Sequence, residues 1–137
     1  MKIDQKMENA PKFRILVVDD EPLLAEMVQQ MLAMLGYDAV FCTGGIEALE
    51  AFRNQPREKS FDLIITDMTM PHFTGEDLVH ELSGLQPVVP VILMTGFSSK
   101  IDAEKASELG IQGFLMKPVA MEELAGTVRT VLDQRKK

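Results

Sequence analysis

The sequence predicts a doubly wound α/β domain with a parallel sheet of strand order 2-1-3-4-5. Short apolar runs of strand length alternate with segments of helical periodicity, and no segment repeats. A polar side chain follows each of four such runs, as expected where buried parallel strands end. These runs are Ile15–Val18, Leu63–Thr66, Val91–Met94 and Gly113–Met116. A chain of 137 residues is large enough for one such domain with its own core.

The first half of the chain predicts three strands and two helices. The expected elements are a strand at Phe13–Val18, a helix from Pro22 to Leu35, a strand at Tyr37–Cys42, a short helix ending at Arg53 and a strand at Asp62–Thr66. Pro22 suits the first turn of a helix, and Gly36 is a typical stop. Thr43 can cap the short helix. Residues 1–12 are polar and are expected to form a flexible tail.

The second half continues the alternation. The expected elements are a helix over Glu76–Ser83, a strand ending at Thr95, a helix capped by Ser98 or Ser99 and ending at Leu109, a strand at Ile111–Met116 and a helix over Ala120–Asp133. Gly96 and Gly110 interrupt the chain where elements change. The predicted domain therefore covers residues 13–133, and residues 134–137 form a C-terminal tail.

The charge balance and the apolar pattern exclude several classes of protein. The net charge is −7, with 21 acidic against 14 basic residues, which argues against direct nucleic-acid binding. No apolar run has the length of a membrane span, and the first residues lack the apolar core of a signal peptide. Cys42 is the single cysteine, so no intrachain disulfide can form. We therefore expect a cytoplasmic protein without membrane contact.

Five polar residues are expected to meet at one edge of the sheet. Asp19, Asp20, Asp67, Thr95 and Lys117 all stand at the C-terminal ends of predicted strands. These ends lie along the edge where ligands bind in folds of this class, and the topological switch point falls between the first and third strands. Each motif alone is weak, because an Asp pair is commonly a helix cap and a Lys before Pro is commonly a surface residue. Their combination indicates a site.

The acidic residues of this edge predict a magnesium site. Three carboxylates that lie close together repel one another unless a cation compensates them. Mg²⁺ prefers oxygen ligands and keeps waters or phosphate oxygens in its shell. We expect Asp20 and Asp67 to bind the ion directly, Asp19 to act through water and the carbonyl of Thr69 to contribute a backbone ligand.

The same edge suits phosphoryl transfer onto a carboxylate. Asp67 is the best nucleophile, because it lies centrally and carboxylate attack on phosphorus gives an aspartyl phosphate. Lys117 can supply charge to one phosphoryl oxygen, and the Thr95 hydroxyl or backbone amides can bind another.

Two other functions on this fold are less well supported. A flavin or dinucleotide module needs a phosphate-binding first loop, whereas the acidic loop at 19–22 would repel phosphate. An aspartyl-phosphate phosphatase needs an acid or base beside the nucleophile, typically an Asp two residues on, where this chain has Thr69.

Four segments of the chain resemble the receiver domain of two-component response regulators. They are Ile15–Glu21, Ile64–Pro71, Val91–Gly96 and Phe114–Pro118, and the resemblance covers about residues 13–133. It implies a flavodoxin-like (βα)₅ fold and often a cis Lys117–Pro118 bond. It also implies a signalling domain rather than an enzyme. Such a domain accepts a phosphoryl group on Asp67, with Mg²⁺, from a sensor histidine kinase or a histidine phosphotransfer protein.

The resemblance further assigns a switch and an output face. Thr95 and Phe114 would be the switch residues, although from the residues alone Phe114 is simply a core aromatic. The output face would comprise residues 99–109, strand five and the last helix.

The first helix carries a second apolar stripe beside its core stripe. Leu23, Met27 and Met34 flank the core period formed by residues 24, 28, 31 and 35. Leu23 and Met27, together with Val119, are candidates for docking the phosphodonor, and a wide core stripe is the alternative. The sequence does not decide three further points. The chain could be a binding module that acts without phosphorylation, it could form a homodimer on phosphorylation, and it could be attached to a hybrid kinase.

Overall fold

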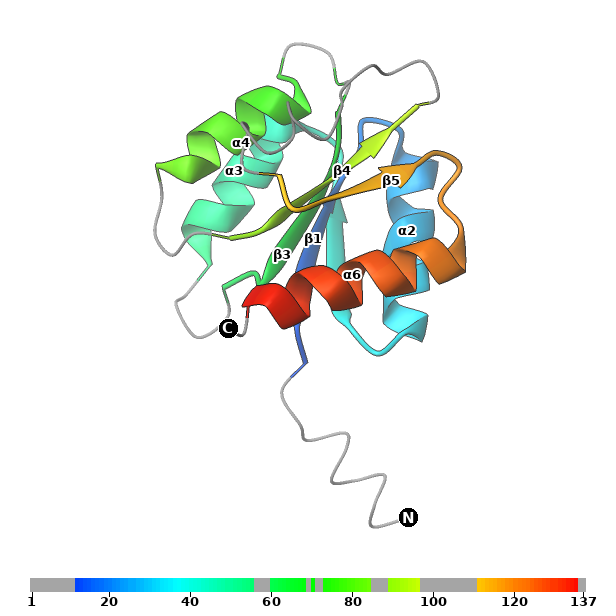
Figure 1. Cartoon of the computed structure of the whole chain (residues 1–137). Helices are drawn as coiled ribbons and strands as arrows, with labels where there is room; N and C mark the ends of the chain where they lie inside the picture. Colours follow the sequence, from blue (N-terminus) through cyan, green and yellow to red (C-terminus); the bar gives the residue numbers. More distant parts are fainter. Residues whose placement is uncertain are drawn as a thin grey trace.

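The domain consists of a five-stranded parallel sheet with helices on both faces (Figure 1). The structure is a computed structural model, which describes residues 12–55, 60–68, 70, 73–84, 89–96 and 111–135. The strands are β1 Arg14–Val18, β2 Asp38–Cys42, β3 Leu63–Asp67, β4 Val91–Thr95 and β5 Gly113–Met116. The helices are α2 Pro22–Met34, α3 Gly45–Asn54, α4 Gly75–Ser83 and α6 Met121–Arg135. The strand order is β2-β1-β3-β4-β5, with every pairing parallel, so the predicted topology is confirmed.

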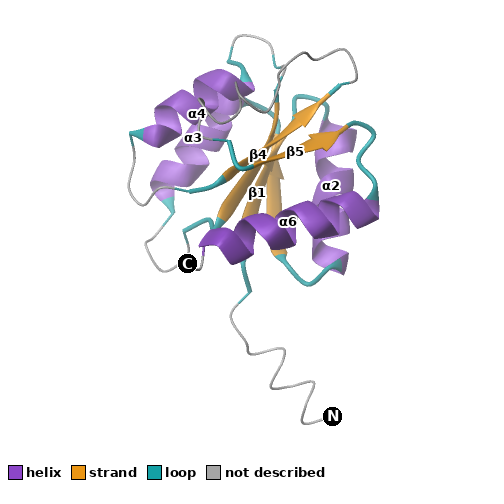
Figure 2. Ribbon diagram, in the orientation of Figure 1, coloured by secondary structure: helices purple, strands orange, loops and turns teal. Residues whose placement is uncertain are grey.

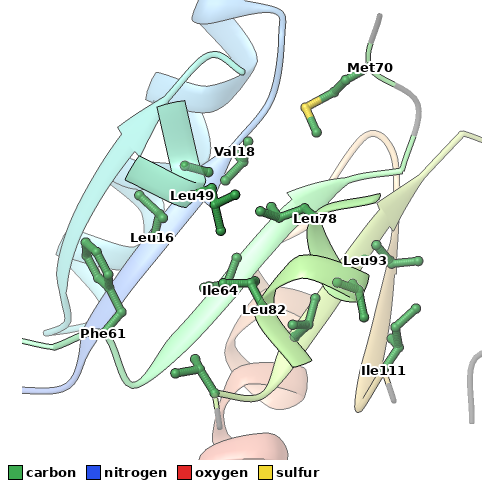
Figure 3. Close-up of a cluster of buried hydrophobic side chains, with 14 residues drawn as sticks. Leu16, Val18, Leu49, Phe61, Ile64, Met70, Leu78, Leu82, Leu93 and Ile111 are labelled. Carbon is green, nitrogen blue, oxygen red and sulfur yellow. The ribbon is translucent and has the colours of Figure 1, made fainter. Parts of the chain in front are cut away.

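The sheet separates two hydrophobic clusters. Helices α2 and α6 cover one face, and α3 and α4 cover the other (Figure 2). Along β1, Leu16 and Val18 point toward α3 and α4, in the cluster of Figure 3, whereas Ile15 and Val17 join the opposite cluster. Because both faces are buried, β1, β3 and β4 are apolar without alternation, as is typical of a central parallel sheet. None of the helices in the described ranges is long and apolar enough to span a bilayer.

Both ends of α2 follow the predicted residues, whereas the cap of α4 was not predicted. Pro22 occupies the first turn of α2, and Gly36 after its end has a φ of 97°, which a residue with a side chain rarely adopts. Helix α4 begins with a capping box: the Thr74 hydroxyl accepts from the Asp77 amide at 3.1 Å, and Asp77 Oδ2 accepts from the Thr74 amide at 2.9 Å. This box starts the helix one residue before the predicted Glu76.

The structure corrects the predicted start of α3. Thr43 is not the cap; Gly44 occupies that position without a side-chain hydrogen bond, and the helix begins at Gly45. A Cβ added to Gly45 would lie 2.1 Å from Cδ1 of Phe73, so the ring packs directly on the first turn. Gly45 thus allows the first turn of α3 to lie against the Phe73 ring.

Other predicted boundaries shift by one or two residues. Asp67 is the last residue of β3 rather than the first of a loop, and α6 continues past Asp133 to Arg135. Leu35 is not a core residue, because the buried positions of α2 are Ala25, Val28 and Leu32. The predicted helix that ends at Leu109 lies outside the described residues.

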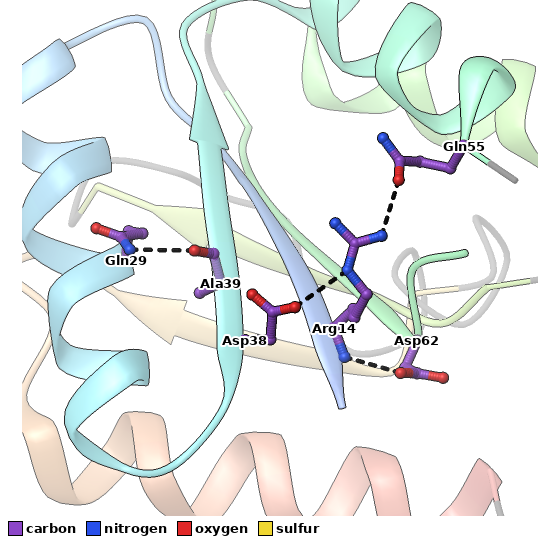
Figure 4. Close-up of polar contacts among 6 residues, drawn as sticks. All are labelled: Arg14, Gln29, Asp38, Ala39, Gln55 and Asp62. Carbon is purple, nitrogen blue, oxygen red and sulfur yellow. Dashed lines mark hydrogen bonds and ion pairs between the residues drawn. The ribbon is translucent and has the colours of Figure 1, made fainter. Parts of the chain in front are cut away.

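Arg14 connects four segments at the edge of the sheet opposite the strand C-termini (Figure 4). Its amide donates to Asp62 Oδ2 at 2.8 Å, and its guanidinium donates to Gln55 Oε1 at 2.8 Å and to Asp38 Oδ2 at 3.3 Å. The guanidinium carbon also lies 4.8 Å from the centre of the Phe61 ring. The Asp38 carboxylate is half exposed, so this ion pair contributes little, and the Gln55 bond and the ring contact matter more.

Replacing Arg14 with methionine should lower the free energy of unfolding by about 1–3 kcal/mol, because a hydrogen bond and a cation–π contact are lost while the apolar stem is kept. Urea unfolding would measure the change. Lys12→Met, at an exposed position two residues earlier, is the matched control and should leave the stability nearly unchanged. Equal effects of the two substitutions would contradict a specific role for the guanidinium.

Candidate functional site

The candidate site lies at the edge formed by the C-terminal ends of the strands. Asp19 follows β1 and Asp67 ends β3. The two strands are neighbours, with Val18 paired to Thr66, so the next residue of each strand falls at the same level of the edge. Asp19 is fully buried and Asp67 is 5% exposed, whereas Asp20 reaches solvent. The sheet topology therefore brings together the acidic residues that the sequence placed at this edge.

Lys117 joins the two buried carboxylates. Its Nζ lies 2.8 Å from Asp19 Oδ2 and 3.1 Å from Asp67 Oδ1. Lys117 follows β5, so its long side chain crosses β4 to reach β3 and β1. Its amide donates to the Thr95 carbonyl at 2.8 Å, and the Lys117–Pro118 peptide bond is cis, as the resemblance implied.

The carboxylates hold Lys117 in its charged form. Burial lowers the pKa of the ammonium, but the hydrogen bonds and charges of Asp19 and Asp67 outweigh this effect and raise the pKa above its ordinary value. The ammonium is therefore a fixed positive charge beside Asp67 throughout the physiological pH range.

The three carboxylates fit a divalent cation. Asp19, Asp20 and Asp67 each offer an oxygen within 4.8 Å of the others. Oxygens bound to one Mg²⁺ lie at most about 4.2 Å apart, so a small closing movement of these side chains would form the site. Apart from its ion pair with Lys117, Asp19 Oδ2 is buried without a hydrogen-bond partner among the residues that the structure describes. Thr69, the predicted backbone ligand, lies outside the described residues.

The Thr95 hydroxyl has a partner that the sequence did not predict. Thr95 ends β4 and is 4% exposed, and Met94 before it pairs with Asp67 in the sheet. Its Oγ1 donates to the thioether sulfur of Met116 on β5, at 3.4 Å. The two residues are register partners on adjacent strands. The predicted strand order was therefore the one sequence-based signal that β5 lies beside Thr95.

Gly75 fixes the chain that follows Asp67. A Cβ at this position would lie 2.6 Å from the Asp67 carbonyl oxygen and 3.0 Å from Met68 Cα, so no larger residue fits without a backbone shift. The Gly75 amide also donates to the Met68 carbonyl at 3.0 Å. The sequence shows only a glycine near a helix start, which does not by itself reveal this close approach.

The predicted docking residues occupy one surface beside the site. Leu23 is 83% and Met27 40% exposed on α2, so a wide core stripe does not account for them. Val119 is half-buried against the cluster under α2 and α6. A pocket of about 270 Å³ opens between these elements, and Met27, Val119, Asp19 and Lys117 are among its lining residues. The acidic edge and the apolar surface are therefore continuous.

Phe114, the predicted second switch residue, is half-buried and packs against the cluster on the α3 and α4 side of the sheet. This position agrees equally with a core aromatic and with a side chain that changes position.

Cys42 and the histidines do not suit a nucleophilic role. Burial, supported by the charge of Glu47 and opposed by the hydrogen bond to Gly44, raises the pKa of the Cys42 thiol to about 11, so the thiolate is scarce at neutral pH. His80 lies on the exposed surface of α4, and His72 lies outside the described residues. Asp67 remains the candidate nucleophile.

Comparison with known proteins identifies the family. The model of the response regulator receiver domain matches residues 15–129. The transcriptional regulatory protein ZraR of Escherichia coli (strain K12) is 35% identical over 118 residues, which are 86% of this chain and 26% of ZraR. The two-component response regulator ORR21 of Oryza sativa subsp. indica is 39% identical over 122 residues, 89% of this chain and 17% of that protein. The chain thus spans only 26% and 17% of the length of these two relatives.

Solved structures agree with this result. A response regulator receiver domain protein from Clostridium thermocellum has a TM-score of 0.81 at 29% identity, covering 90% of this chain and 97% of that one. The signal receiver domain of a signal transduction histidine kinase from Syntrophus aciditrophicus has a TM-score of 0.77 at 32% identity, covering 91% and 93%. With the fold, the acidic edge and the family match in agreement, the chain belongs to the receiver domain family of two-component response regulators.

Proposed function

We propose that this chain is the phosphoacceptor of a two-component phosphorelay. It would take a phosphoryl group from a phosphohistidine of a sensor histidine kinase or a histidine phosphotransfer protein onto Asp67. The observation that carries this proposal is the position of Asp67, a buried carboxylate at the switch point of the sheet, 3.1 Å from the Lys117 ammonium. The acidic residues around it could hold Mg²⁺, and an oxygen of the Asp67 carboxylate would attack the phosphorus.

The reaction exchanges one bond to phosphorus for another. An Asp67 oxygen forms the new O–P bond as the N–P bond of the phosphohistidine breaks, and the electron pair of that bond returns to the imidazole. Lys117, already held against Asp67, supplies positive charge to a phosphoryl oxygen. Asp19, Asp20, Asp67 and the Thr69 carbonyl would hold Mg²⁺. The ion, when bound, would neutralise further negative charge on the phosphoryl oxygens. Thr95 would then bind a phosphoryl oxygen through its hydroxyl.

The signal would leave through the face around β5, the strand at one end of the sheet. Movement of the Thr95 hydroxyl toward the phosphoryl group, with Phe114 turning inward, would alter the face formed by residues 99–109, β5 and α6. Thr95 and Phe114 lie on the neighbouring strands β4 and β5, which supports this coupling. A downstream protein, or a second copy of the chain in a phosphorylation-dependent dimer, would bind this face.

The phosphodonor would dock on the apolar surface of Leu23, Met27 and Val119, because Leu23 and Met27 are exposed and Met27 and Val119 line the pocket that borders the site. Replacing Met27 with glutamate should reduce transfer from the cognate donor at least about tenfold without unfolding the protein, since a charge would enter an apolar interface. Met34→Glu is the matched control, on the same helix and 78% exposed but outside the lining of the pocket. Equal transfer to both variants would place the docking surface elsewhere.

The proposed function is tested by incubating the chain with Mg²⁺ and a small acyl phosphate and measuring its intact mass. We expect a single phosphoryl adduct on the parent and none on Asp67→Asn or after EDTA treatment. An adduct that persists on Asp67→Asn would contradict the assignment of the acceptor. If no adduct forms and beryllofluoride also leaves the protein unperturbed, the chain is a degenerate receiver that acts as a binding module.

A further inference from the structure

Met116 is the residue that holds the Thr95 hydroxyl in the structure described here. The Thr95 side chain is buried, and its Oγ1 donates to Met116 Sδ at 3.4 Å. The pairing is built into the sheet, because Thr95 and Met116 are register partners on β4 and β5. The backbone reinforces it, since the Lys117 amide donates to the Thr95 carbonyl at 2.8 Å. The hydroxyl therefore points its proton at β5 rather than at Asp67.

A thioether is an unusual partner for a buried hydroxyl. Sulfur is a weak hydrogen-bond acceptor, much weaker than an amide or carboxylate oxygen. Met116 is also 49% exposed and unbranched, so it can move aside with little loss of packing. The hydroxyl is thus satisfied in this state but is held only weakly.

We propose that Met116 is a positioning residue that sets how readily the Thr95 hydroxyl leaves β5 for a phosphoryl group on Asp67. The proposal rests on the proposed function, in which that hydroxyl binds a phosphoryl oxygen. The hydroxyl has one proton to donate, so its bond to Met116 and its bond to the phosphoryl group exclude each other. A stronger acceptor at position 116 then favours the state in which the hydroxyl bonds to β5, and a weaker acceptor favours the state in which it binds the phosphoryl group.

Two substitutions at this position should act in opposite directions. Met116→Leu keeps the size but removes the acceptor, and it should raise the affinity for beryllofluoride in Mg²⁺ about two- to fivefold, the effect expected for one neutral hydrogen bond. Met116→Gln keeps the length but offers a carbonyl oxygen, and it should lower that affinity by a similar factor. Titration calorimetry would measure both. Met34→Leu, at an exposed methionine of α2, is the control and should change nothing.

The same substitutions in a Thr95→Val background separate this role from general packing. Without the hydroxyl, Met116→Leu and Met116→Gln should leave the affinity of the Thr95→Val protein unchanged. Effects that persist in this background would show that position 116 acts through packing and would overturn the proposal. Equal beryllofluoride affinities of the parent and both Met116 variants would overturn it as well.

A second measurement needs no phosphoryl analogue. In protein labelled at the methionine methyl carbons, the Met116 resonance, assigned by its loss in Met116→Leu, should shift in Thr95→Val without Mg²⁺ or beryllofluoride. An unmoved resonance would overturn the contact itself. If the resonance shifts but the parent does not bind beryllofluoride, the proposed function fails, and the positioning role fails with it although the contact is real.

Discussion

Replacement of Lys117 by methionine should slow phosphorylation of Asp67 by about 10²–10³-fold, the effect of removing one preorganised charge or donor from a transition state. Methionine keeps the length and the apolar stem of lysine, so the loss is mainly that of the ammonium. The relevant geometry exists before any donor binds, since Nζ already lies 3.1 Å from Asp67 Oδ1. The rate of adduct formation with an acyl phosphate and Mg²⁺, followed by intact mass, measures this effect.

The same substitution should destabilise the metal-free protein. It leaves the fully buried Asp19 and the nearly buried Asp67 without their shared cation, and breaking such a pair costs about 3 kcal/mol. Mg²⁺, no longer repelled by the ammonium, should bind the variant about tenfold more tightly. The variant should thus be less stable and bind Mg²⁺ more tightly, yet be phosphorylated more slowly. This combination would show that the Lys117 charge promotes phosphoryl transfer independently of metal binding.

The pH dependence of stability gives an independent reading of the same ion pair. Because the folded-state pKa of Lys117 is raised above 10.5, its stabilisation is fully present below that pH and is lost as the pH rises through the folded-state pKa. The parent should therefore lose stability above about pH 10.5, and Lys117→Met should lack this part of the decline. Lys12→Met, exposed and distant in sequence, is the control and should behave as the parent. A parallel decline in all three proteins would contradict the role of Lys117.

The sequence was informative about the site because the fold concentrates it at strand ends. A buried parallel strand is a continuous apolar run, and the first polar residue after it marks the edge of the sheet. Asp19, Asp67 and Lys117 meet at this edge as their places after the apolar runs predict, although boundaries moved by a residue and Asp67 ends β3. Pattern and topology together were sufficient for these residues, since backbone position alone determines that they meet.

Features that depend on close packing could not be predicted in this way. In the sequence Met116 is identifiable only as the end of a strand, because its bond to Thr95 requires the β4–β5 register and a particular side-chain direction. Glycine is required at position 45 by the close approach of Phe73 and at position 75 by that of the Asp67 carbonyl oxygen. Neither contact is between neighbours in the sequence. Thr43 had the right chemistry for a helix cap, but α3 begins two residues later, at Gly45, where the Phe73 ring leaves no room for a side chain.

Millimolar Mg²⁺ should raise the melting temperature of the parent, and Asp20→Asn should remove most of this response. An ion present at 100 times its dissociation constant stabilises the folded state by about 2.7 kcal/mol, which corresponds to about 10 °C for a domain of this size. Asp20 is the informative position because Lys117 binds Asp19 and Asp67, so both ion pairs survive the substitution. Differential scanning fluorimetry with and without Mg²⁺ measures the shift.

The metal-free Asp20→Asn protein should be at least as stable as the parent, because the substitution removes one negative charge from a cluster of three neighbouring carboxylates and asparagine keeps the shape. Loss of the Mg²⁺ response would then reflect a lost ligand rather than a damaged fold. Glu50→Gln, an exposed acid on α3, is the matched control and should retain the full shift. A parent melting temperature that Mg²⁺ leaves unmoved would contradict the metal site. A full shift in Asp20→Asn would instead restrict the carboxylate ligands to Asp19 and Asp67, with Lys117 between them as the competing cation.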